Sequence, residues 1–180
     1  MRMDSKAAEE ATVLRTAQAM CAAARTAPKA RGVDQIHTLI LTGDEIGELA
    51  DEMDRVGDSL EAPFFHRDAD NVRQSTAVVL FGVTYDQRGL SEICQLCNNH
   101  TCQECREKNA VCVYDPMDLG IALGSAVSVA ARDRIDNRIL FSAGKTALAG
   151  GYFDPSVMLV MAVPLSCSGK SPYFDRPAAK

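Results

Sequence analysis

Residues 94–112 have the sequence CQLCNNHTCQECREKNAVC and contain five of the seven cysteines of the 180-residue chain. The other two, Cys21 and Cys167, lie far away in the sequence. A cysteine that is buried for packing behaves as a small apolar residue and needs no other cysteine nearby. Here the residues between the cysteines are mostly polar. The segment therefore predicts a loop that is either cross-linked by disulfides or folded around a metal centre.

The composition is that of a globular protein, with 47% hydrophobic and 24% charged residues. We expect one domain that spans residues 1–180. The net charge is −5 and no long basic run occurs, so nucleic acid is not an expected partner. The longest strongly apolar run, residues 157–165, is far shorter than the roughly 20 residues of a membrane-spanning helix. No secretion signal is recognisable at the N-terminus, and we expect a cytoplasmic protein without a membrane partner.

The expected location favours a metal centre over disulfides, because cytoplasmic thiols are kept reduced. Free thiols that switch with redox conditions are the alternative interpretation of the same segment.

The spacing of the cysteines distinguishes between kinds of metal centre. Two Cys-x2-Cys pairs, Cys94 with Cys97 and Cys102 with Cys105, are separated by only four residues. Structural zinc sites of this type place roughly 12–20 residues between the pairs. An iron–sulfur cubane is larger than a single zinc ion, so the compact spacing favours a [4Fe-4S] cluster. Cys94, Cys97 and Cys102 are the predicted ligands, and the fourth is either Cys105 or Cys112.

A short helix is predicted to begin at Cys102, because Thr101 and Glu104 have the spacing of a capping box. The free N–H groups of its first turn would then face an anionic cluster. Both candidates for the fourth ligand can reach the cluster, one from the next turn of this helix and the other from the returning chain. His100 is a further candidate, although a loop histidine more often donates a hydrogen bond to a ligand.

Outside this segment, apolar periodicity predicts helices that alternate with buried strands. Thr42 and Glu45 have capping-box spacing at the start of the second helix. Residues 135–147 are interpreted as a short extended piece and a turn, and residues 59–73 are left unassigned. The alternation of predicted helices with buried strands favours an α/β or α+β sandwich. The predicted helices are 5–26, 42–56 and 116–131, and the predicted strands are 36–42, 76–83 and 157–163.

Four segments together resemble an uncharacterised prokaryotic family of small proteins named for a ferredoxin domain. They are the cysteine segment, DLGIALGSAV at 118–127, DNRILFSAG at 136–144 and VPLSCSGKSPYFDR at 163–176. The resemblance covers roughly residues 22–176. It implies that the ligands of a [4Fe-4S] cluster are Cys94, Cys97, Cys102 and Cys112, which leaves Cys105 as a spare.

Residues 23–45, AARTAPKARGVDQIHTLILTGDE, are similar to a segment of FMN-dependent nitroreductases at a helix end before the first strand. This similarity implies an α+β, nitroreductase-like sandwich whose central sheet is covered by helices. Residues 90–114 would then be an inserted cluster segment. It also implies a homodimer with FMN at the interface.

The same similarity implies residues for FMN. The N–H of Gly144 would lie near the reactive flavin nitrogen. Basic side chains would bind the flavin phosphate, and the candidates are Arg25, Lys29 and Arg31, or Lys170 and Arg176.

These observations predict a cytoplasmic iron–sulfur redox protein, and with FMN an oxidoreductase acting on a small substrate. An electron-donor protein would be its partner, and the sequence identifies no catalytic residue. Two alternatives belong to other classes: a cluster-binding sensor or assembly protein without catalytic activity, and a zinc-stabilised interaction module.

Overall fold

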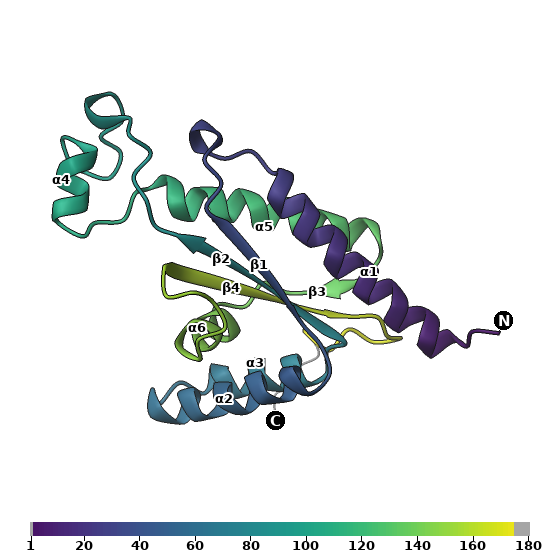
Figure 1. Cartoon of the computed structure of the whole chain (residues 1–180). Coiled ribbons are helices and arrows are strands. Elements are labelled where there is room, and N and C mark those ends of the chain that lie inside the picture. The colour runs from purple at the N-terminus through teal and green to yellow at the C-terminus, as the bar shows by residue number, and fades with distance from the viewer. Residues whose placement is uncertain (1, 175–180) are drawn as a thin grey trace.

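The computed structural model describes residues 2–174 and shows a mixed α/β sandwich (Figure 1). Its sheet has four antiparallel strands in the order β1-β2-β4-β3. The strands are β1 (Ile36–Leu41), β2 (Ala77–Thr84), β3 (Asp136–Asn137) and β4 (Val157–Ser166). The helices are α1 (Ser5–Thr26), α2 (Asp44–Ser59), α3 (Phe64–Arg73), α4 (Cys102–Glu107), α5 (Tyr114–Arg132) and α6 (Phe141–Ala149), with short 3-10 turns η1 (Ala30–Gly32) and η2 (Ser91–Ile93).

Helices cover both faces of the sheet, with α1 and α5 on one face and α2, α3 and α6 on the other (Figure 1). The central strand β2 contributes to both cores because its side chains alternate between the faces. Val79 and Phe81 pack with α1 and α5, while Val78 and Leu80 pack with α2, α3 and α6. All four side chains are fully buried. The predicted sandwich with a helix-covered central sheet is therefore confirmed.

Most of the predicted elements are present at nearly the predicted bounds. The helix at 5–26 is α1, and the carboxylate of Asp4 caps it by accepting the N–H of Ala7 at 2.8 Å. The three predicted strands correspond to β1, β2 and β4, and the helix predicted at 116–131 lies within α5. Within residues 2–174, no helix has the length and apolar character needed to cross a membrane.

Two helices and one cap differ from the predictions. Residues 135–147 form β3 and most of α6 instead of an extended piece and a turn, and α3 occupies much of the unassigned 59–73. Neither helix has a side-chain cap at its N-terminus, so the local sequence does not mark its start. The capping box predicted at Thr42 is also wrong. The cap of α2 is Gly43, which has φ +60° and makes no side-chain hydrogen bond.

A histidine on α3 contacts α2 and makes the stability of this helix pair depend on pH. Nδ1 of His66 lies 2.7 Å from Asp54, and Nε2 lies 3.2 Å from Asp58. The hydrogen bond to Asp54, which also pairs with Arg73, raises the pKa of the imidazole above 6.5. The contact therefore stabilises the fold fully below pH 6.5, and this contribution is lost as the pH rises through the folded pKa.

We expect His66→Gln to reduce the pH dependence of the free energy of unfolding above pH 6.5, because glutamine does not titrate. Urea unfolding of both proteins across this range measures the difference. Parallel pH profiles for the two proteins would show that the His66 contacts do not contribute.

Candidate metal centre

The cysteine-rich segment joins β2 to α5 and projects beyond the end of the sheet (Figure 1). As predicted, α4 begins at Cys102 and Thr101 is its cap, with Oγ1 accepting the N–H of Glu104 at 3.0 Å. The carboxylate of Glu104 reaches back to accept the N–H of His100 at 2.7 Å. These two hydrogen bonds fix the chain immediately before Cys102.

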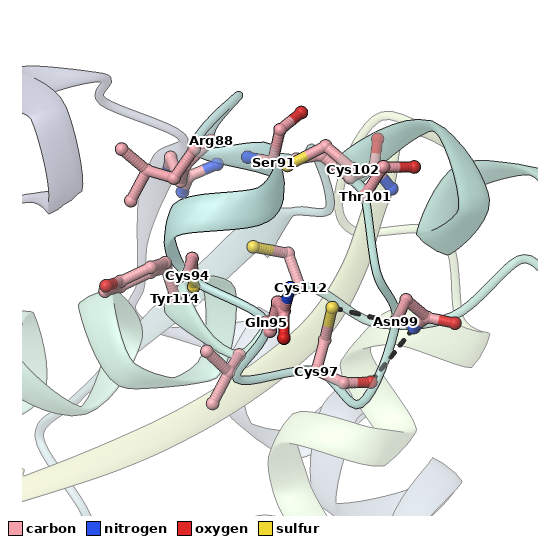
Figure 2. A pocket seen from close by; sticks show the side chains of 13 residues that line it. Arg88, Ser91, Cys94, Gln95, Cys97, Asn99, Thr101, Cys102, Cys112 and Tyr114 are labelled. Carbon is pink, nitrogen blue, oxygen red and sulfur yellow. Dashed lines mark hydrogen bonds between the residues drawn. The ribbon is translucent and has the colours of Figure 1, made fainter.

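Four of the five cysteines line one pocket, which Figure 2 shows from close by. Cys94 follows η2, Cys97 lies on the next turn, Cys102 starts α4 and Cys112 is on the returning chain. Cys112 is only 7% exposed, while the other three are half-buried. The structure thus brings together the four residues that the family resemblance implied as ligands.

Cys105 does not line this pocket. Its side chain is 1% exposed, and its Sγ donates to the carbonyl of Ala110 at 3.2 Å. Burial raises the pKa of this thiol to about 11, and the nearby Cys97 adds to the shift. The sulfur of Cys105 is therefore directed to a backbone carbonyl and not into the pocket that the other four cysteines line.

Hydrogen-bond donors surround the sulfur atoms in the pocket. The amide of Asn99 lies 3.6 Å from Sγ of Cys97, and its hydrogen bond lowers the pKa of this thiol (Figure 2). The backbone N–H of Ser91 donates to Sγ of Cys102 at 3.2 Å. Tyr114 also lines the pocket, and the nearby Cys94 raises the pKa of its hydroxyl. Such donors stabilise thiolates, which is the form that a metal centre requires.

The donor set is all sulfur, which suits soft metal centres such as zinc or an iron–sulfur cluster. Among residues 2–174, no three His, Cys, Asp or Glu side chains are arranged to hold a single metal ion. The four thiols instead surround a shared pocket, as a cluster with one iron at each corner requires. His100 does not line the pocket, and its ring lies 3.4 Å from the side-chain amide of Gln95.

A buried ion-pair network lies next to the pocket, and the sequence interpretation missed it. Arg88, which lines the pocket, lies 2.9 Å from Asp115 and 3.2 Å from Asp118 near the start of α5. The guanidinium of Arg31 donates to the carbonyl of Arg88 at 2.7 Å, and the N–H of Ala30 donates to Asp118 at 3.0 Å. The network therefore ties the cluster segment to α5 and to the loop before β1.

The network is only partly satisfied. Nε of Arg88 and Oδ1 of Asp115 are buried without a hydrogen bond of good geometry among residues 2–174. Burial raises the pKa of Asp115 to about 6, although Arg88 acts in the opposite direction. Two acidic residues three apart in an apolar helix were the available sequence signal, because a buried carboxylate needs a partner.

The three cations predicted to bind the flavin phosphate lie close together in the sequence, Arg25 in the last turn of α1 and Lys29 and Arg31 on the loop between α1 and β1. Each one, however, contacts acceptors of the protein itself. Arg25 pairs with Asp34 at 2.5 Å, and Arg31 is bonded to the carbonyl of Arg88. Lys29 donates to carbonyls at the end of α1, one of them at 2.7 Å, and its side chain is only 5% exposed.

The other predicted flavin residues lie elsewhere. Gly144 is in α6, on the opposite face of the sheet from α1. A Cβ at this position would lie 2.1 Å from the carbonyl oxygen of Val160, so glycine is required for close packing of α6 on β4. Lys170 is on the loop after β4, where its carbonyl accepts the hydroxyl of Ser168 at 2.7 Å. Arg176 lies outside the described residues.

Two comparisons concern relatives in sequence. The family described as "Uncharacterized protein containing a ferredoxin domain (DUF2148)" matches residues 108–176, which include Cys112. An uncharacterized protein of Archaeoglobus fulgidus is 41% identical over 169 residues, which cover 89% of this chain and 90% of that protein.

Solved structures of nitroreductases share the fold. A nitroreductase from Bacteroides fragilis with bound FMN has a TM-score of 0.62 and 11% identity, covering 100% of this chain and 86% of its own. CinD, a nitroreductase from Lactococcus lactis in complex with 4-nitrophenol, has a TM-score of 0.58 and 17% identity, covering 96% and 82%. At such identities the likeness concerns the fold alone, and the predicted nitroreductase-like fold is confirmed.

Proposed function

Because the chain belongs to the family of uncharacterized proteins containing a ferredoxin domain, we propose that it is a redox protein with one [4Fe-4S] cluster. The ligands in this proposal are Cys94, Cys97, Cys102 and Cys112. One observation carries it: these four thiols line the same pocket, whereas Cys105 does not line it and its thiol is hydrogen-bonded to a backbone carbonyl. The family and the nitroreductase fold both suggest a redox function.

When bound, a [4Fe-4S] cluster supplies one-electron transfer. Four cysteine ligands leave no iron position open to a substrate, which favours electron transfer over substrate activation. The chain contributes the thiolates, the hydrogen bonds that stabilise them and the burial of Cys112. In this proposal the electrons come from a donor protein, and the protein works in the reducing cytoplasm, where the thiols stay available.

FMN is the second part of the proposal and rests on the likeness to nitroreductases, one of which has bound FMN. Among residues 2–174 of one chain, the residues expected to hold it do not form a site. The cations at the end of α1 and on the loop before β1 contact other groups of the protein, and Gly144 packs on the opposite face of the sheet. A flavin site would therefore need a second copy of the chain, as in a homodimer, and we assign no reaction step to it.

The absorption spectrum of anaerobically purified protein tests the proposal. We expect a broad visible absorption that bleaches on reduction, as a cysteine-bound iron–sulfur cluster gives. Denaturation then reports on FMN, because a released flavin is yellow and fluorescent. A cluster without flavin would favour the electron carrier or sensor over a flavin enzyme. Zinc without visible absorption would contradict the proposal and leave the zinc-stabilised module.

A further inference from the structure

A hydrogen bond joins the loop before β1 to the wall of the pocket that the four cysteines line. The guanidinium of Arg31 donates to the backbone carbonyl of Arg88 at 2.7 Å. Arg88 is only 3% exposed, which limits the access of water to this carbonyl. Gly89 follows it, and a Cβ at Gly89 would lie 3.0 Å from the nitrogen that donates. Glycine at this position therefore lets the side chain of Arg31 approach the backbone closely.

The chain that follows Arg88 leads directly to two of the proposed ligands. Both Arg88 and Ser91 line the pocket. The N–H of Ser91 donates to Sγ of Cys102 at 3.2 Å, and the carbonyl of Ser91 accepts the N–H of Cys94 at 3.3 Å. The carbonyl of Arg88 is thus only three residues before a donor to one ligand and six residues before another ligand.

The backbone of Arg31 is held in a conformation that few side chains adopt. Its φ is +56° and its ψ is +16°, and the next residue, Gly32, also has a positive φ of +70°. A residue with a Cβ in this left-handed region costs free energy and persists where surrounding contacts hold it. Here the N–H of Ala30 is fixed by the carboxylate of Asp118 on α5, whose oxygens lie at 3.0 Å and 3.2 Å. Backbone strain at a residue whose side chain reaches the pocket wall indicates a functional reason for the conformation.

We propose that Arg31 is a positioning residue that slows loss of the cluster by holding the carbonyl of Arg88. The contact fixes the chain that carries Cys94 and the N–H donor to Cys102. This inference rests on the proposed [4Fe-4S] cluster. It assigns Arg31 no contact with the cluster, and a role other than the phosphate contact that the similarity to nitroreductases implied.

Arg31→Gly is the decisive variant, because it removes the guanidinium and relieves the backbone strain at the same time. Each protein is loaded with the cluster, and loss of iron to an excess of a ferrous chelator is followed under anaerobic conditions. We expect about tenfold faster loss in Arg31→Gly, the effect of one lost hydrogen bond from a charged donor. Arg31→Lys keeps a cationic donor and should lose iron more slowly than Arg31→Gly. Arg132→Gln removes an exposed cation in the last turn of α5 and should keep the wild-type rate.

Hydrogen exchange of the loaded proteins separates a local effect from a loss of overall stability. In Arg31→Gly we expect faster exchange in residues 88–94 and unchanged exchange in the buried strand β2. Faster exchange in β2 that matches the faster loss of iron would overturn the inference, because the cluster would then be lost through general destabilisation.

The outcomes separate this inference from the proposed function. Wild-type protein without iron and sulfide would contradict the proposed function itself. A loaded wild-type protein that loses iron no more slowly than Arg31→Gly would overturn the inference alone. An Arg31→Gly protein that binds no cluster while β2 stays protected would support the inference. Arg31→Met removes the donor and keeps a long side chain, so its rate of iron loss decides if Arg31→Gly does not fold.

Discussion

Replacing Cys112 by alanine should remove the cluster, whereas replacing Cys105 by alanine should leave it in place. In the Cys112→Ala protein we expect iron to fall from about four per chain to near zero, because one corner of the cluster loses its thiolate. Cys105 is not expected to substitute. Its Sγ lies outside the pocket and is hydrogen-bonded to the carbonyl of Ala110.

Cys167→Ala is the matched control for the loss of a thiol, since Cys167 is remote from the cluster segment and packs against the core between the sheet, α1 and α5. Iron and acid-labile sulfide in the three variants, purified under anaerobic conditions, give the result. Equal cluster content in Cys112→Ala and Cys105→Ala would show that either thiol can serve as the fourth ligand. Loss of the cluster in Cys105→Ala alone would reverse the assignment.

A second large effect is expected on the stability of the protein when the buried ion pairs next to the pocket are broken. We expect Arg88→Met to lower the free energy of unfolding by about 3–5 kcal/mol, because it leaves two buried carboxylates without their cation. Asp115 is fully buried and Asp118 is 2% exposed, so water cannot replace the guanidinium. The substitution also removes a link between the cluster segment and α5.

Arg106→Met provides the control on the same segment. Arg106 is 67% exposed and lies 3.4 Å from Asp86, and an exposed pair of this kind contributes about 0–1 kcal/mol. Urea unfolding of the two metal-free variants measures both effects. A loss below about 1 kcal/mol for Arg88→Met would show that the buried network does not hold the segment to the fold.

The parts of the fold that the sequence predicted are those that local patterns encode. The apolar run at 76–83 becomes the central strand β2, and the periodicity at 5–26 becomes α1. The helix α6 was missed because packing defines it. Its buried face consists of small residues, including Gly144, which lets the helix approach the backbone of β4. Such closeness depends on β4, which follows later in the chain.

In the candidate site, too, local patterns predicted some features, and features that depend on long-range packing were missed. Spacing and family resemblance predicted the four thiols, and the capping signal at Thr101 predicted α4. The residues that surround the thiols were not predicted. Arg88 and Asp118 are 30 residues apart, and the pocket is lined by Tyr114 at the start of α5 as well as by Cys94 after η2. No local pattern encodes such long-range contacts.

The most direct test of the central claim is the count of iron and acid-labile sulfide in the anaerobically purified wild-type protein. The proposed cluster predicts about four of each per chain. One zinc ion per chain with neither iron nor sulfide would contradict it.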